Sequence, residues 1–194
     1  MLTCMALSTS PRRGGNSEIL ARQALAGARA GGAAIDLIRL ADFRYEPCRA
    51  CGGCYRTGVC VIPDQAADVF DRLLAADRVI VAAPIFSMGI CAQAKAIIDR
   101  AQRFWATRIL LHRRVVANPD SRPKRRGIFI STAGSNLPGV FDGALPVVRY
   151  FFKMLEIQPA GFYGYRNLEG KGDAAGNAQA MAEAFLAGVR LAGE

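Results

Sequence analysis

The chain of 194 residues carries a formal net charge of +9 at pH 7, with 25 Lys and Arg against 16 Asp and Glu. Because a chain of this length can bury a sizeable core, its six cysteines are not needed as disulfide staples, which argues against a small secreted fold. The start, "MLTCMALSTSPRRGGNSE", lacks the basic leader and long apolar run of a signal peptide or membrane span. We therefore expect one domain over residues 1–194, located in the cytoplasm and without a membrane segment.

Five short apolar runs predict strands at residues 2–8, 35–40, 78–84, 126–132 and 157–165. Amphipathic helices are predicted where apolar residues recur at helical spacing, as at Ala66, Val69, Phe70 and Leu73, at Ala94, Ile97, Ile98 and Ala101, and at Ala178, Met181, Ala182 and Phe185. This alternation is typical of βαβ units around a parallel sheet, so the predicted fold class is α/β. Two segments are predicted to be irregular: a cysteine-rich loop over about 43–63 and a basic insertion over about 104–126.

The loop after the first strand, "STSPRRGGNSE" at residues 8–18, offers hydroxyl groups, an amide and backbone N–H groups where a helix begins. Oriented N–H donors at a helix N-terminus suit a phosphate, and Arg12 or Arg13 could add an ion pair. The segment has neither the lysine-bearing loop of nucleoside triphosphate binders nor the G-x-G-x-x-G of dinucleotide binders. An ordinary capped turn between strand and helix is the alternative interpretation.

Four of the six cysteines form the pattern C-x2-C-x2-C-x5-C: Cys48, Cys51, Cys54 and Cys60. Three cysteines at successive x2 spacing are typical of loops that wrap a cubane in bacterial ferredoxins, so the pattern predicts a [4Fe-4S] cluster. Structural zinc sites usually join two separated pairs, which makes zinc the weaker interpretation. A thiol or disulfide loop without metal is the remaining alternative.

Three stretches together carry a family resemblance: S-x-S-P-R-x-x-G-N-S at residues 8–17, P-I-F-S-M-G at 84–89 and S-T-A-G at 131–134. They resemble motifs of the NADPH-dependent FMN reductase branch of the flavodoxin-like flavoproteins. With its four clustered cysteines, the chain is similar to the iron-sulfur flavoproteins of that branch. The resemblance implies a flavodoxin-like three-layer sandwich with a five-stranded parallel sheet in the order 2-1-3-4-5.

The same resemblance implies the residues of an FMN site. The phosphate would be held by Ser8, Ser10, Arg12, Asn16 and Ser17. The isoalloxazine would be lined on one side by Pro84, Ile85, Phe86, Ser87, Met88 and Gly89. Its other side would face Thr132, Ala133 and Gly134.

The expected function is electron transfer between a ferredoxin-like one-electron carrier and a two-electron acceptor, through FMN and the cluster. An NAD(P)H-dependent FMN or quinone reductase without a bound cluster is the alternative. No acid or base catalyst is expected, because the single histidine, His112, lies among arginines and is interpreted as a solvated side chain. The resemblance also implies a homodimer or homotetramer.

Residues 108–127 carry seven basic side chains against the single acid Asp120. A solvated, mobile face is the default interpretation of this excess. The functional interpretation is that the arginines dock an acidic electron carrier or the phosphates of NAD(P)H. A redox sensor or nucleic-acid-binding protein is a third hypothesis, which is disfavoured because the basic residues lack interleaved aromatic side chains.

Overall fold

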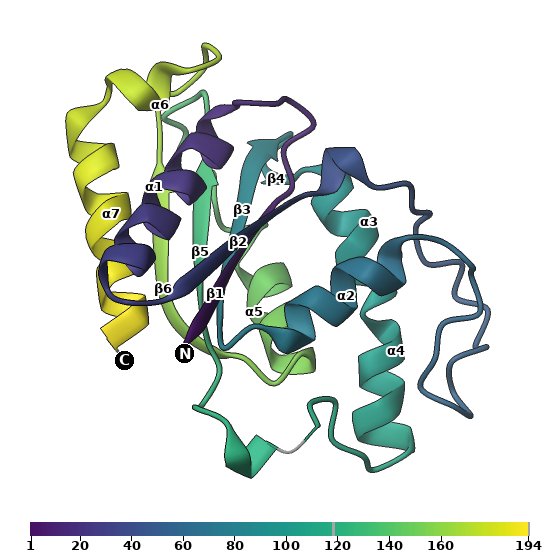
Figure 1. Ribbon diagram of the computed structural model, residues 1–194. Coiled ribbons are helices and arrows are strands. Elements are labelled where there is room, and N and C mark those ends of the chain that lie inside the picture. The colour runs from purple at the N-terminus through teal and green to yellow at the C-terminus, as the bar shows by residue number, and fades with distance from the viewer. Residues whose placement is uncertain (118, 194) are drawn as a thin grey trace.

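Five parallel strands form the centre of the computed structural model, which describes residues 1–117 and 119–193 (Figure 1). They follow the spatial order β2-β1-β3-β5-β6, and their bounds are β1 (Thr3–Ser8), β2 (Ala34–Arg39), β3 (Arg78–Phe86), β5 (Arg126–Thr132) and β6 (Gln158–Tyr165). The two-residue β4 (Gly89–Ile90) pairs antiparallel with the end of β3. The predicted α/β class and strand order 2-1-3-4-5 are therefore confirmed, with β4 as an addition.

Helices cover both faces of the sheet, which makes three layers (Figure 1). One face carries α1 (Asn16–Ala30) and α7 (Ala178–Gly193), and the other carries α2 (Ala66–Ala75), α3 (Ala92–Arg100) and α5 (Leu145–Met154). Shorter helical segments of the described residues are η1 (Leu40–Asp42), α4 (Gln102–Trp105), η2 (Ala106–Leu110), η3 (Pro119–Ser121) and α6 (Asp173–Gly176). None of the helices in this part of the chain is both long and apolar enough to cross a membrane.

The close approach of α1 and α7 depends on glycine. A Cβ added at Gly27 of α1 would lie 1.9 Å from the carbonyl oxygen of Phe185, and one at Gly188 of α7 would lie 1.8 Å from that of Ala24. Both separations are far below van der Waals contact, so a larger residue at either position would push the two helices apart. This pair of glycines thus sets the spacing between α1 and α7, which lie side by side on one face of the sheet.

The carboxyl ends of the five parallel strands share one edge of the sheet. The three central strands are buried on both faces, as expected for a parallel sheet between two helical layers. In such sheets ligands bind beyond the carboxyl ends, so the loops after β1, β3, β5 and β6 form the region of interest.

The predicted basic insertion over 104–126 is partly helical. From Gln102 to Leu110 the chain continues the direction of α3 through α4 and the π-helical η2, while Asn118 lies outside the described residues. Arg122 and Arg125 donate hydrogen bonds to backbone carbonyl groups at the end of α2, those of Leu73, Leu74, Ala75 and Ala76. These two arginines therefore cap a helix C-terminus, and the buried Arg125 is not part of an exposed basic face. Residues 43–63, in contrast, contain no helix or strand.

Candidate functional site

The loop between β1 and α1 brings hydroxyl groups and helix N–H groups to the carboxyl edge of the sheet. Ser10 Oγ accepts a hydrogen bond from the N–H of Arg12 at 3.1 Å, and Gly15 is the N-cap residue of α1. A Cβ added at Gly15 would lie only 2.9 Å from Ser10 Oγ. The loop therefore needs glycine at this position to bring the start of α1 against Ser10.

Two hydroxyl groups of this loop have unused hydrogen-bonding capacity. Ser8 Oγ and Ser17 Oγ are buried and have no hydrogen-bond partner among the residues that the structure describes. The first N–H groups of α1 also lack partners within the helix, as at any helix start. Because a buried polar group without a partner is costly, Ser17 Oγ and these N–H groups fit an anion bound at the helix N-terminus, whereas Ser8 Oγ is fully buried at the end of β1 and does not line the cleft.

Asn16 joins the loop before α1 to a second loop, residues 168–174, which follows β6. Its side-chain amide makes four hydrogen bonds of 2.9–3.1 Å with backbone groups of that loop, in Leu168, Gly170, Gly172 and Ala174. Two donated and two accepted bonds are the full capacity of an amide side chain. No side-chain donor of Asn16 is therefore left for a ligand, and the residue fixes the position of the second loop.

These loops line a cleft with about 580 Å³ of unfilled space, part of which is open to solvent. Nine of the predicted FMN residues meet there: Ser10, Arg12, Asn16, Ser17, Pro84, Ile85, Phe86, Thr132 and Gly134. Five other predicted residues do not line it: Ser8, Ser87, Met88, Gly89 and Ala133. Ser8 and Ala133 are buried, and the other three belong to the β3–β4 hairpin.

Four residues that line the cleft were missed by sequence reasoning: Gly15, Leu168, Glu169 and Lys171. Three of them belong to the loop after β6. A signal for that loop was present, because the last strand of a parallel sheet ends at the same edge as the others. The segment "NLEGKG" at residues 167–172 follows this strand closely and carries two charged side chains, Glu169 and Lys171, on either side of Gly170.

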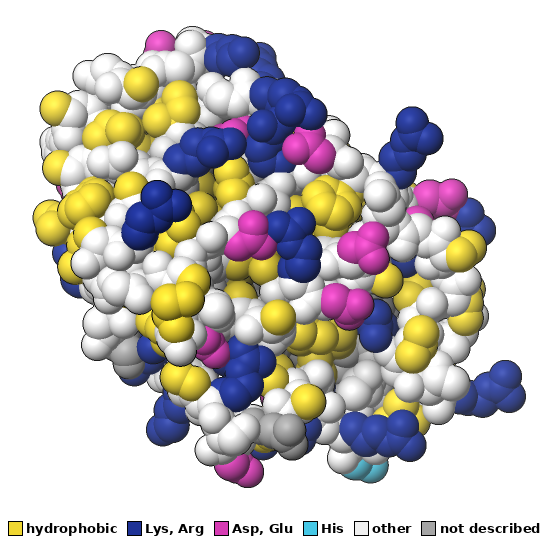
Figure 2. All heavy atoms as spheres, in the orientation of Figure 1, with side chains coloured by type: hydrophobic (Ala, Val, Ile, Leu, Met, Phe, Trp, Pro, Cys, Tyr) yellow, Lys and Arg dark blue, Asp and Glu magenta, His cyan; other side chains and the backbone are white. Residues whose placement is uncertain are grey.

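Charges of both signs line the cleft. Arg12 and Lys171 are basic, and Lys171 Cε lies 4.0 Å from the position that a Cβ on Gly14 would take. Glu169 covers Gly134, where an added Cβ would lie 1.6 Å from Glu169 Oε2. Figure 2 shows basic side chains gathered at the top of the molecule, over the loops that lead into α1 and α6. Two cations are thus available beside a helix N-terminus, a position that favours a negatively charged group.

The β3–β4 hairpin holds two non-glycine residues in a left-handed conformation. Ser87 has a φ angle of 49° and Met88 one of 62°, and they are the two central residues of the turn. Turns with two left-handed central residues usually contain Asn or Gly, because other side chains are strained there. The turn also requires Gly143 beside it, since a Cβ at that position would lie 2.7 Å from the Met88 carbonyl oxygen. A strained hairpin therefore borders the cleft, with Phe86 and Met88 exposed.

The four predicted cluster ligands line one small cavity of their own. It is formed by Cys48, Cys51, Cys54 and Cys60 with neighbouring residues that include Arg100 and Arg103. Burial raises the pKa of the Cys54 thiol, and the other three thiols of the loop raise it further, which means that the four groups interact. Within residues 1–117 and 119–193, no three His, Cys, Asp or Glu side chains are arranged to hold a metal ion. The thiols are thus gathered at one cavity without forming a finished metal site.

Left-handed turns fold the cysteine loop. Gly52 has a φ angle of 70° and Gly58 one of 76°. At Gly58 there is also no room for a side chain, because an added Cβ would lie 2.4 Å from Thr107 Oγ1. Arg103 Nε donates to the carbonyl oxygen of Gly58 at 3.1 Å, which fastens the loop to α4. The helical start of the basic insertion therefore supports the cysteine loop.

A buried ion pair closes the same cavity. Arg100 and Asp64 form two hydrogen bonds, of 2.6 and 3.1 Å, and Asp64 also accepts the N–H of Ala66 at the start of α2. Burial lowers the pKa of Arg100, but Asp64 and the nearby Cys60 raise it, and the net shift is upward. Arg100 is therefore a permanent positive charge next to the thiols.

The remaining cysteines and the histidine do not form a site. Cys4 lies in β1, where burial raises its pKa to about 12, and burial also raises the pKa of Cys91 at the start of α3. His112 is exposed at the end of η2. Neither cysteine is a thiolate near neutral pH, so neither is a candidate for redox chemistry or for binding a metal.

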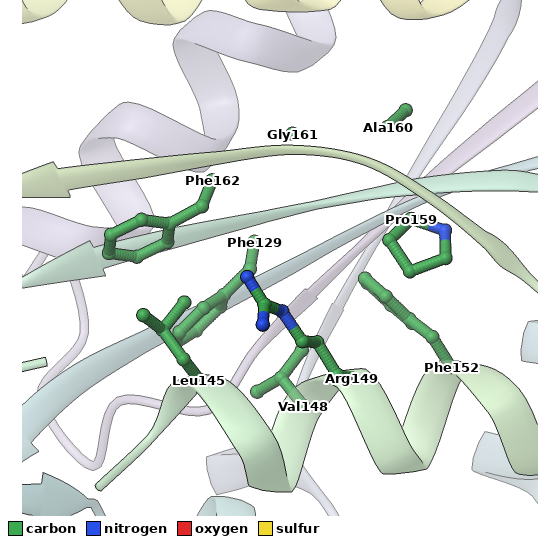
Figure 3. A pocket seen from close by; sticks show the side chains of 9 residues that line it. All are labelled: Phe129, Leu145, Val148, Arg149, Phe152, Pro159, Ala160, Gly161 and Phe162. Atoms are coloured by element: carbon green, nitrogen blue, oxygen red, sulfur yellow. The ribbon is translucent and has the colours of Figure 1, made fainter. Parts of the chain in front are cut away.

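A separate cavity of about 570 Å³ of unfilled space, partly open to solvent, lies between α5 and β6 (Figure 3). Its lining is mainly apolar, with Phe129, Leu145, Val148, Phe152, Pro159, Ala160, Gly161 and Phe162. Figure 3 shows Arg149 reaching from α5 toward β6. None of the predicted site residues lines this cavity, so the cleft and the cysteine cavity are the candidate functional sites.

The fold and the cleft at the carboxyl ends of its strands define a flavodoxin-like α/β protein. Residues 2–164 match the family described as NADPH-dependent FMN reductase. The chain belongs to that family, which is a family of oxidoreductases. The predicted resemblance to this branch and to the iron-sulfur flavoproteins is confirmed.

One similar protein is the iron-sulfur flavoprotein of Methanosarcina thermophila, which is 38% identical over 95 residues. The match covers 49% of this chain and 50% of that protein, so the chain spans about half the length of this relative. The NAD(P)H:quinone oxidoreductase of Methanothermobacter marburgensis has a TM-score of 0.70 at 15% identity, over 98% of this chain and 96% of that one. The FMN-dependent NADH-azoreductase of Bacillus anthracis, solved in complex with FMN, has a TM-score of 0.66 at 14% identity, over 99% and 100%. The similarity to these two solved structures, at 15% and 14% identity, is a similarity of fold.

Proposed function

We propose that this chain is an FMN-containing iron-sulfur flavoprotein that transfers electrons between a ferredoxin-like one-electron carrier and a two-electron acceptor. When bound, FMN takes up one or two electrons and a [4Fe-4S] cluster takes up one, so the pair links one-electron to two-electron chemistry. The protein's own residues bind these groups, orient them and set their reduction potentials. No side chain of the chain is assigned an acid or base role.

In this proposal the cleft holds FMN, with its phosphate at the N-terminus of α1. Ser10 and Ser17 donate through their hydroxyl groups, the first N–H groups of α1 add oriented donors, and Arg12 pairs with the negative charge. We add Lys171 as a second cation and assign Asn16 a positioning role, because its side chain already binds the 168–174 loop. The buried Ser17 Oγ without a partner supports this assignment, as does the FMN bound to the Bacillus azoreductase of the same fold.

The isoalloxazine is assigned to the part of the cleft between Pro84–Phe86 and Thr132–Gly134. Glu169 covers Gly134 on that side, and its side chain is exposed. A ring that lies against Gly134 therefore requires the Glu169 carboxylate to turn toward solvent. The hairpin residues Ser87–Gly89 and Ala133 would support the lining from outside the cleft.

The observation that carries the proposal is that four thiols line one cavity beside a buried arginine. Four cysteines match the number of protein ligands of a single cubane, and thiolates hold such clusters. The name of the Methanosarcina relative supports the same assignment. Cys48, Cys51, Cys54 and Cys60 are thus the proposed ligands.

Metal analysis of anaerobically purified protein tests this assignment. Protein produced with sufficient iron should hold about four irons and four sulfides per chain, together with FMN. The charge-transfer absorption of the cluster should extend beyond the flavin bands, and air should bleach it. About one zinc per chain, or no metal at all in repeated preparations, would contradict the cluster.

A cluster-free NAD(P)H-dependent FMN or quinone reductase is the second candidate, which the family description favours. Steady-state oxidation of NADPH, with FMN or a quinone as the acceptor, separates the two functions. Fast turnover by protein without iron supports the reductase. Turnover that requires both the cluster and a reduced ferredoxin supports electron transfer from a carrier.

We also infer that the chain assembles as a homodimer or homotetramer, as the family resemblance implies. Light scattering of the protein loaded with FMN tests this. A mass of one chain, about 20.8 kDa, would contradict it.

A further inference from the structure

Arg100 is a buried cation next to the cysteine cavity. It is the last residue of α3 and is 3% exposed. Its Nη1 donates to Asp64 Oδ2 at 2.6 Å and to the Glu46 carbonyl oxygen at 2.8 Å, and its Nη2 donates to Asp64 Oδ1 at 3.1 Å. Since a buried guanidinium is costly unless it is paired, these bonds explain why Arg100 is tolerated at this position.

The Nε–H of Arg100 remains unsatisfied. Nε is buried, and no hydrogen-bond partner for it exists in the described part of the chain. A guanidinium offers only donors, so Nε–H needs an acceptor. The two-bond contact with Asp64 uses the far end of the guanidinium and fixes its plane, which leaves the Nε side free. Arg100 lines the same cavity as the four cysteines, whose side chains offer sulfur as an acceptor.

Arg103 provides a matched comparison at the same cavity. It also lines the cavity and is also positively charged, but its Nε already donates to the Gly58 carbonyl oxygen at 3.1 Å. The two arginines therefore differ at Nε, and Arg100 is in addition more deeply buried and paired with Asp64, whereas Arg103 is half-buried. Arg100 has a buried donor available, and Arg103 has used its own to hold the loop.

We propose that the Nε–H of Arg100 donates a hydrogen bond to a sulfur of the cluster, either the Cys60 thiolate or a sulfide next to it. The inference rests on the proposed function, because it requires a bound cluster. Hydrogen bonds to cluster sulfurs stabilise the added negative charge of the reduced state, and so raise the reduction potential. Arg100 thus sets the potential at which the protein accepts an electron.

Potentiometric titration of two variants tests the donor role. Both Arg100→Gln and Arg103→Gln remove one positive charge from the lining of the cavity, but only the first removes the free Nε–H. Arg100→Gln also removes the buried partner of Asp64, so the ¹⁵N measurement on the parent chain is needed to separate the hydrogen bond from the loss of the ion pair. We expect the reduction potential of the cluster to fall in Arg100→Gln by at least about 59 mV more than in Arg103→Gln. For a one-electron couple, this difference is a tenfold shift of the equilibrium toward the oxidised cluster. Equal shifts in the two variants, with the cluster intact, would overturn the inference and leave the proposed function standing.

A second measurement uses the parent chain, so the test does not depend on whether Arg100→Gln folds. In protein labelled with arginine that carries ¹⁵N only at Nε, and reduced with dithionite, pulsed electron paramagnetic resonance should detect ¹⁵N coupled to the cluster. The coupling should persist in Arg103→Gln, because Arg100 is its source. A cluster without any ¹⁵N coupling would overturn the inference even if Arg100→Gln fails to fold. Parent protein without iron and sulfide would instead refute the proposed function, and the inference with it.

Discussion

Replacing Asn16 with Ala should weaken FMN binding although the side chain has no donor to give to the phosphate. The substitution removes four hydrogen bonds to the 168–174 loop. Each bond contributes about 0.5–1.5 kcal/mol. Because Gly170 is exposed and its backbone regains water, we take the low end, about 2 kcal/mol in total. If FMN binding requires this loop in place, affinity falls about thirtyfold.

Titration of the apo protein with FMN and with riboflavin locates the effect. Lys171 lies on the loop that Asn16 holds and is assigned to the phosphate, so loss of riboflavin affinity should be much smaller than loss of FMN affinity. Asn177→Ala is the matched control, because the Asn177 side chain makes one bond, to the N–H of Ala180, and does not line the cleft. This control should bind FMN like the parent chain.

A double-mutant cycle with Lys171→Met tests whether the two residues act together. If Asn16 works by placing Lys171, the effect of Asn16→Ala should shrink by at least about 1 kcal/mol in the Lys171→Met background. Additive losses would refute the coupling of the two residues. Unchanged FMN affinity in Asn16→Ala, with a correctly folded chain, would refute the reasoning as a whole.

Three further outcomes follow from single side chains. Arg125→Ala should lower the free energy of unfolding, measured by urea titration, by about 3–5 kcal/mol, because it leaves carbonyl groups at the ends of α2 and α5 unpaired. The surface variant Arg113→Ala is the control and should change this free energy by less than about 0.5 kcal/mol. Cys54→Ala should lose iron but keep FMN by absorption spectroscopy, because different loops hold the two groups. Burial of Asp77 opposes ionisation, but hydrogen bonds from Arg122 and Thr3 lower its pKa overall. Asp77→Asn should therefore lower the free energy of unfolding at neutral pH. The loss should shrink as the pH falls below about 4, because the carboxylate of the parent chain then becomes protonated.

The strands were predictable because their signal is local, whereas their order was predicted from the family resemblance. The apolar stretches at 79–84 and 127–130 are short and unbroken, as is typical of a strand buried on both faces of a parallel sheet. β4 was missed because two residues carry no period, and only the turn at Ser87 and Met88 creates the pairing. The helix over 102–110 was missed since its charged residues hide the apolar positions Phe104 and Ala106, which are buried.

The parts of the site that sequence reasoning missed depend on contacts between distant residues. Asn16 and the 168–174 loop are about 150 positions apart, so no local pattern reveals that the amide is already used. Arg122 and Arg125 belong to a run of basic residues and were grouped with them, yet both donate to carbonyl groups at the end of α2, and Arg125 is buried. The sequence shows that a side chain is basic, but only the fold determines whether that side chain faces solvent, a helix end or a ligand.

The helix α3 gives the two proposed sites a common support. It begins directly after the β3–β4 hairpin that borders the cleft, and it ends at Arg100 in the cysteine cavity. The cysteine segment is fastened to both ends of this helix, by Tyr45 Oη to the Gln93 carbonyl oxygen at 2.9 Å and by the bonds from Arg100. Nine helical residues span about 14 Å. A loop without helix or strand is therefore held at a fixed distance from the cleft, as the proposed electron transfer between FMN and the cluster requires.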